Sequence, residues 1–123
     1  MSGRLENKVC YITGAASGIG LACAERLSAE SATVIGSDLR FSDEWNKRAT
    51  GEGSFYELDV RDEQAQMEVV SNIVGSYGRI DAVITSAGVA GGGPVHSIDL
   101  ENWQHVQDVN LTGTMLTIKA VLP

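Results

Sequence analysis

Thr13-Gly14-Ala15-Ala16-Ser17-Gly18-Ile19-Gly20 joins a short apolar run, Val9 to Ile12, to a helical pattern that begins at Gly18 and reaches about Glu30. The apolar run is typical of a buried strand. Gly14 lets the chain turn tightly, Gly18 lets the backbone approach a pyrophosphate with no Cβ in the way, and Gly20 lets the helix pack closely on the sheet. The unpaired N–H groups at the helix start favour a phosphate. A glycine-rich turn without a ligand is the alternative, since glycines alone are a weak signal.

An acidic residue further along the chain favours the ligand-binding interpretation. Asp38 follows a second strand-like run, Thr33 to Ser37, and lies 18 positions after Gly20, close to the spacing of a dinucleotide-binding unit. A carboxylate at this place accepts hydrogen bonds from the adenosine ribose and repels a 2′-phosphate. The next residue is Leu39, although Arg40 comes within reach of a phosphate. The pattern therefore predicts NAD as the cofactor in preference to NADP.

Strand and helix patterns alternate along the whole chain. Strands are expected at residues 9–12, 33–37, 54–58 and 80–85, and helices at 18–30, 62–76 and 99–122, with a short helix plus loop within 43–53. Such alternation predicts an α/β fold with a doubly wound parallel sheet of the Rossmann type, formed as one domain over residues 1–123. Two helical stripes are expected to face the core; they consist of Ile19, Cys23 and Leu27, and of Val69, Val70, Ile73, Val74 and Tyr77.

Composition and charge exclude several other classes of protein. The formal net charge of the 123 residues is −7, which argues against nucleic acid as a partner. No apolar run is long enough to span a membrane, and the first eight residues lack the apolar stretch of a signal peptide, so we expect a cytoplasmic protein. Cys10 and Cys23 have no Cys or His at metal-ligand spacing, which predicts buried structural thiols and no metal site.

Five motifs in order give the chain its resemblance to the classical short-chain dehydrogenase/reductase family. The glycines are spaced Gly-x-x-x-Gly-x-Gly, Asp59-Val60 follows the third strand, and Ser86-Ala87-Gly88 ends the fourth strand. Val109-Asn110-Leu111-Thr112-Gly113 is similar to the Asn-containing helix motif of the family, and Lys119-Ala120-Val121-Leu122-Pro123 is similar to the end of the same helix. Thr85-Ser86 replaces the two asparagines that are usual in the family.

The resemblance implies an NAD-dependent oxidoreductase that transfers hydride between an alcohol and a ketone or aldehyde. It implies that the adenine ring contacts Asp59 and Val60, and that Asn110 distorts its helix and holds a water of the proton relay. It also implies a homo-oligomer, because the family uses the helix that contains Asn110 for subunit pairing. The expected cofactor-binding residues are Gly14, Ser17, Gly18, Ile19, Gly20, Asp38, Leu39, Asp59, Val60, Ser86, Ala87 and Gly88, and Asn110 is the expected catalytic residue.

The chain departs from the family in its catalytic residues. The family uses a tyrosine with a lysine four residues later and a serine upstream, but the residues four positions after Tyr11, Tyr56 and Tyr77 are Ala15, Val60 and Asp81. We therefore expect a partial sequence, roughly half of a family member, that is truncated after the helix following the fourth strand and is inactive alone. A non-catalytic dinucleotide-binding module and an interaction fragment stay open as alternatives.

Several remaining residues carry weaker signals. His96 and His105 have no nucleophile or metal partner in the sequence, so we expect them to be surface or satisfied histidines. Trp103 precedes Asn110 at helical spacing and is expected to be a packing residue. Gly91-Gly92-Gly93 either lines a substrate cleft beyond the strand ends or is a flexible loop.

Overall fold

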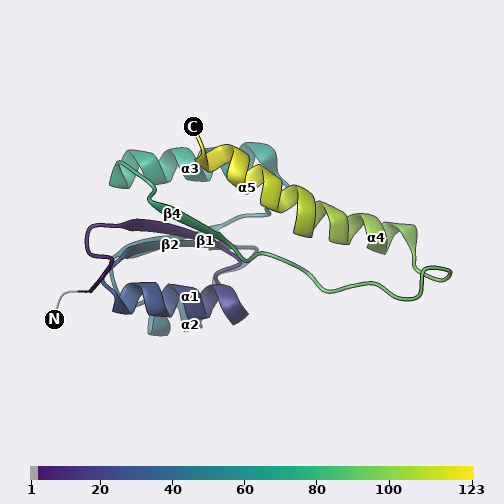
Figure 1. Cartoon of the computed structure of the whole chain (residues 1–123), viewed down its shortest axis with the longest axis horizontal. Coiled ribbons are helices and arrows are strands. Elements are labelled where there is room, and N and C mark those ends of the chain that lie inside the picture. The colour runs from purple at the N-terminus through teal and green to yellow at the C-terminus, as the bar shows by residue number, and fades with distance from the viewer. Residues whose placement is uncertain (1–2) are drawn as a thin grey trace.

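The computed structural model describes residues 3–123 as a four-stranded parallel sheet with helices on both faces (Figure 1). The strand order is β3-β2-β1-β4. Neighbouring strands are paired in parallel, with Tyr11 opposite Ile35 on one side and opposite Val83 on the other. The bounds are β1 Val9–Thr13, β2 Thr33–Asp38, β3 Gly53–Glu57 and β4 Ala82–Thr85. The predicted α/β, Rossmann-type arrangement is confirmed.

The helices form one layer on each side of the sheet. Figure 1 shows α1 (Gly18–Ala29) and α2 (Asp43–Arg48) below the strands, and α3 (Glu63–Tyr77) and α5 (Gly113–Val121) above them. Helix α3 begins at Asp62, whose carboxylate accepts the Ala65 N–H, and ends at Gly78 with a left-handed φ of 82°. These two caps delimit the long helix that covers the second face.

Each face of the sheet has its own apolar core. The side chains of Cys10, Ile12, Ala15, Leu21, Ala24, Ala32, Val34 and Trp45 fill the space under α1 and α2. Val9, Tyr11, Ile35, Leu58, Val69, Val70 and Ile73 fill the space under α3. All residues of β1 are buried, and because successive side chains point to opposite faces of the sheet, Tyr11 lies in the second core. Burial there raises the pKa of its phenol to about 12, and its hydroxyl forms a 2.9 Å hydrogen bond with that of Ser37.

Four expectations about packing are wrong in detail. Ile19 is 76% exposed because the first turn of α1 lies at the end of the sheet, and Val74 is 45% exposed on the outer side of α3. Cys10 is buried as predicted, but Cys23 is only partly buried. Trp103 is 50% exposed, since its helix reaches beyond the sheet and has no buried residue.

The periodicity predicts one continuous helix over residues 99–122, but the last helical segment is interrupted around Asn110, where the family resemblance implies a distorted helix. Helix α4 (Leu100–Gln107) leads into a π-helical turn, η1 (Asp108–Thr112), and then into α5. In Figure 1 the α4 end projects past the strands, while α5 lies beside α3. The turn η1 therefore joins an outlying helix to the helix that packs on the sheet.

None of the helices in residues 3–123 combines the length and the apolar character that a membrane crossing requires.

Candidate functional site

A pocket of about 300 Å³ lies at the carboxyl ends of the strands. This is where open parallel sheets bind ligands. Four chain segments from strand ends contribute to it, together with one face of the last helical segment. The lining residues are Gly14, Ser17, Gly18, Ile19, Asp38, Leu39, Leu58, Asp59, Val60, Arg61, Ser86, Ala87, Gly88, Val89, His105 and Val109. All twelve predicted cofactor-binding residues except Gly20 therefore meet at one pocket.

The glycines of the first loop occupy places that larger residues would disturb. Gly14 has a φ of 67°, and a Cβ there would lie 2.6 Å from the Ala87 nitrogen. A Cβ on Gly20 would clash with the Gly14 carbonyl oxygen. Gly20 therefore lets the helix pack closely against the loop, although it does not line the pocket. Gly18 has a φ of 57°, and a Cβ on it would project into open space. Gly18 therefore leaves free volume at the pocket wall.

The start of helix α1 presents donors beside that free volume. Ser17 is its N-cap residue, yet the hydroxyl makes no capping hydrogen bond. No acidic side chain lies in the first turn. The first amides of a helix have no intrahelical acceptor and carry a partial positive charge. This wall of the pocket suits an anion.

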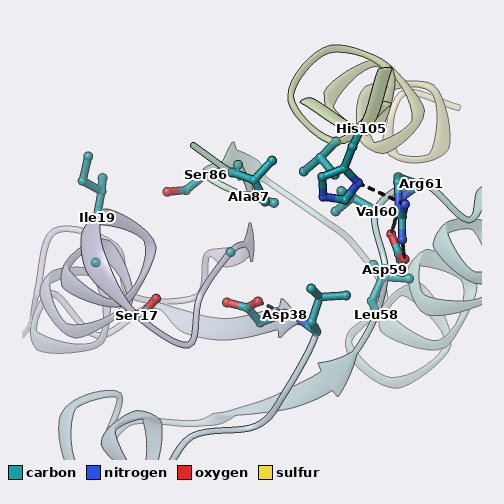
Figure 2. A pocket seen from close by; sticks show the side chains of 16 residues that line it. Ser17, Ile19, Asp38, Leu58, Asp59, Val60, Arg61, Ser86, Ala87 and His105 are labelled. Atoms are coloured by element: carbon teal, nitrogen blue, oxygen red, sulfur yellow. Dashed lines mark hydrogen bonds and ion pairs between the residues drawn. The ribbon is translucent and has the colours of Figure 1, made fainter. Parts of the chain in front are cut away.

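Asp38 is held by backbone amides at the end of β2. One carboxylate oxygen accepts the Ala16 N–H at 3.0 Å, and the other accepts the Leu39 N–H at 2.7 Å. Figure 2 shows Asp38 between the glycine loop and the end of β3. Each oxygen keeps further acceptor capacity, so the carboxylate is fixed in place and still able to accept hydrogen bonds from a ligand.

The side of the pocket opposite the glycine loop is lined by apolar side chains, with a buried polar side chain behind them. Leu58, Val60 and Val109 are all buried. Beneath Val60, the fully buried Gln66 donates from Nε2 to the Val60 carbonyl at 3.0 Å and to the Thr117 hydroxyl at 2.8 Å. Gln66 thus ties the pocket floor to α3 and α5. No sequence motif points to Gln66, because an isolated glutamine in a helical pattern is typical of an exposed position.

The segment after β4 closes the pocket. The Ser86 N–H donates to the Thr13 carbonyl at 3.2 Å, and the Ala87 N–H donates to the Thr13 hydroxyl at 3.4 Å. These contacts join the end of β4 to the end of β1.

Asn110 is exposed and lies within the turn η1. Its side chain accepts the Val89 N–H at 2.8 Å and donates to the Val89 carbonyl at 2.9 Å. Asn110 thereby holds the backbone just after Ser86-Ala87-Gly88, the strand end that lines the pocket. It does not line the pocket itself.

Arg61 and His105 line the pocket although the sequence assigned them no role there. Arg61 pairs with Asp59, with Nη2 2.6 Å from a carboxylate oxygen, and its Nη1 lies 3.4 Å from Nδ1 of His105. His105 was expected to be a surface or satisfied histidine; it is exposed and has this contact. The position of Arg61 directly after Asp59-Val60 was the available signal, but nothing in the sequence pointed to His105.

Known proteins match this chain throughout its length. The family model described as short chain dehydrogenase matches residues 8–123. The chain is 40% identical over 125 residues to the 3-oxoacyl-[acyl-carrier-protein] reductase FabG of Thermotoga maritima, covering 98% of this chain and 51% of the reductase. It is 37% identical over 120 residues to galactitol 2-dehydrogenase of Agrobacterium fabrum, covering 96% of this chain and 47% of that enzyme. It spans about half the length of these curated relatives.

The fold also occurs in solved structures. Carveol dehydrogenase from Mycobacterium avium, in complex with NAD, superposes with a TM-score of 0.89 at 32% identity, over 99% of this chain and 50% of that one. The superposition thus covers the chain segments that form the pocket in this chain. On the strength of the match over residues 8–123, the chain belongs to the short-chain dehydrogenase family.

Proposed function

We propose that the pocket binds NAD and that these residues are the cofactor-binding part of an oxidoreductase that converts an alcohol to a ketone or aldehyde, or the reverse. The observation that carries the proposal is the convergence of the glycine loop, Asp38 and Asp59-Val60 on one pocket of about 300 Å³. These residues come from the ends of three strands, and together they bring backbone donors, a carboxylate acceptor and apolar side chains to one pocket.

Successive parts of the pocket lining suit the pyrophosphate, the adenosine ribose and the adenine ring of a dinucleotide. The amides at the start of α1 suit the pyrophosphate. The fixed carboxylate of Asp38 suits the adenosine ribose hydroxyls, and the apolar side chains of Leu39, Val60 and Val109 suit the faces of the adenine ring. Ser86, Ala87 and Gly88 line the remaining wall.

A bound nicotinamide ring would supply the hydride acceptor or donor, and the protein would orient it. The residues of this chain contribute binding and orientation. Asn110 acts as a positioning residue in this proposal, because it fixes Val89 next to the strand end that lines the pocket. The water-holding role that the family resemblance implies for Asn110 is part of the same proposal.

The carboxylate of Asp38 sets the preference for NAD. A 2′-phosphate would lie beside this negative charge, and the neighbouring Leu39 offers no positive charge to offset it. The complex of carveol dehydrogenase with NAD and the polyol substrate in the name of galactitol 2-dehydrogenase support a cofactor and a substrate of these classes.

The test measures dissociation constants of NAD and NADP for the wild-type chain, Asp38→Asn and Asp38→Ala by calorimetry. The asparagine keeps an acceptor for the Ala16 N–H but removes the charge, so it separates electrostatics from loop geometry. We expect the wild-type chain to prefer NAD at least ~10-fold, which is about 1.4 kcal/mol, and both variants to narrow that ratio. Equal or tighter binding of NADP by the wild-type chain would contradict the assignment.

A further inference from the structure

One end of the pocket carries a chain of three polar side chains, Asp59, Arg61 and His105. Figure 2 shows them grouped together, away from Ser17 and Ile19 at the other end. Nε of Arg61 is 3.0 Å from one carboxylate oxygen of Asp59, and Nη2 is 2.6 Å from the other. Nη1 of the same guanidinium lies 3.4 Å from Nδ1 of His105. Arg61 thus connects the segment after β3 to helix α4.

The geometry fixes the orientation of Asp59. The Arg61 backbone N–H also donates to the carboxylate, at 3.0 Å. Hydrogen bonds from the Arg61 side chain, then from its backbone, hold the pKa of Asp59 below its usual value, although partial burial opposes them. The same pairing raises the pKa of Arg61. Both groups are therefore charged at neutral pH, and the carboxylate is an acceptor only.

This end of the pocket is where the base of a dinucleotide belongs. In a bound nucleotide the ribose separates the base from the phosphates. With phosphates at the start of α1 and the ribose at Asp38, the base lies on the far side of Asp38, toward Asp59. The apolar residues Leu58, Val60 and Val109 line that region, so Asp59 is the acceptor placed at the edge of the base.

We propose that Arg61, braced by His105, is a positioning residue that makes the pocket select a 6-amino purine over a 6-oxo purine. This proposal rests on the dinucleotide site proposed above. Adenine has an exocyclic amino group that donates, and a fixed carboxylate accepts from it. A 6-oxo group presents an acceptor in the same place, which an ionised Asp59 repels.

Arg61 restricts the side-chain rotation of both Asp59 and His105, because it contacts both. Its Nε and Nη2 are engaged by Asp59, and Nη1 is directed to His105. The guanidinium is therefore held in one orientation, turned toward Asp59 and His105. Without Arg61, the partly exposed carboxylate of Asp59 is free to turn toward solvent, and its acceptor is lost from the pocket wall.

The experiment compares binding of NAD and of nicotinamide hypoxanthine dinucleotide, which differ at position 6 of the purine and in the proton that the 6-oxo form carries on N1. Calorimetry gives both dissociation constants for wild type, Arg61→Ala, Arg61→Lys and His105→Ala. A matched control is Arg79→Ala, which breaks the similar pair of Arg79 with Asp81. That pair lies at the other end of the strands, where Asp81 accepts the Val9 N–H.

We expect the wild-type chain to favour NAD by ~10-fold or more, because the 6-oxo purine loses the hydrogen bond that the amino group donates to a charged acceptor. Arg61→Ala should reduce that ratio to within about threefold. Arg61→Lys should fall between the two, since an ammonium group lacks the planar fork, and His105→Ala should also narrow the ratio. Arg79→Ala should leave it unchanged.

The outcomes separate the two proposals. An unchanged ratio in a folded Arg61→Ala that still binds NAD overturns the role of Arg61 and leaves the dinucleotide site intact. An equal loss of affinity for both dinucleotides also overturns it, because a merely structural role predicts such a loss. Failure of the wild-type chain to bind either dinucleotide overturns the proposed function and this inference with it.

Discussion

At the scale of single residues, Gly18 combines a left-handed backbone with free space at the pocket wall. Its φ is 57°, and no heavy atom lies within 4 Å of a built Cβ. Gly78, at the end of α3, has a φ of 82° and equally open surroundings, but it does not line the pocket. The two glycines share a backbone requirement and differ in their place relative to the proposed phosphate site.

We predict that Gly18→Ala and Gly78→Ala destabilise the chain by similar amounts, about 1–2 kcal/mol, because each puts an L side chain in the left-handed region. Only Gly18→Ala should weaken NAD binding, by ~10-fold or more, since its methyl group would occupy space that the pyrophosphate needs. Urea unfolding gives the stabilities, and calorimetry gives the affinities. Equal affinities for NAD in the two folded variants would refute the phosphate role of Gly18.

The candidate site was predictable from sequence where its signal is local. Gly14, Gly18 and Asp38 are recognisable because the chain places them at strand ends at a characteristic spacing. The contact of Arg61 with His105 joins residues 44 positions apart, so it appears only once α4 has been placed against the segment after β3. Ile19 was assigned to the core because helical periodicity gives a residue's face but not whether a sheet lies opposite that turn.

At the scale of elements, the turn η1 connects α4 and α5 and carries Asn110 toward the loop after β4. A helical period alone predicted a continuous helix here, because it does not report a local change from α-helical to π-helical hydrogen bonding. Insertions of this kind occur frequently at functional sites. In this chain the turn coincides with the two hydrogen bonds that fix Val89.

We predict that Asn110→Ala frees the segment after Gly88. The variant loses both bonds to Val89, at a cost of about 1–2 kcal/mol, and the Val89 amide should exchange its hydrogen markedly faster. Asn102→Ala is the matched control, because Asn102 on α4 accepts the Gly92 N–H of the same loop at 3.1 Å. Hydrogen exchange measured by NMR compares the exchange rate of the Val89 amide in the two variants. Unaltered exchange at Val89 in Asn110→Ala would show that other contacts fix this backbone.

At the scale of the whole molecule, the titratable side chains that line the pocket are few, and most of them lie at one end. Among the described residues that line it, the titratable side chains are Asp38, Asp59, Arg61 and His105. The last three lie together at one end (Figure 2). Tyr11 is buried in the core against Ser37, and Lys119 pairs with Glu63 at 2.6 Å. Neither residue is available to act as an acid or base at the pocket.

We predict that the 123-residue chain binds NAD but does not transfer hydride at an ordinary enzymatic rate. General acid–base assistance is worth about 10²–10⁴-fold, and no tyrosine here has a lysine four positions later. The measurement is NADH formation by the purified, folded chain with a panel of secondary alcohols and polyols. Turnover comparable to that of a typical dehydrogenase would show that residues of this chain supply the acid.

The convergence of distant segments on one pocket also makes the ligand part of the mechanical integrity of the fold. Residues near positions 14–19, 38–39, 58–61, 86–89 and 105–109 all line it, so a single bound dinucleotide would act as a reversible cross-link between the ends of all the strands. By mass action, NAD at 100 times its dissociation constant would add about 2.7 kcal/mol to the free energy of unfolding. The melting temperature would then rise with NAD concentration, and amide protection would spread to β3 and β4, the two outermost strands of the sheet.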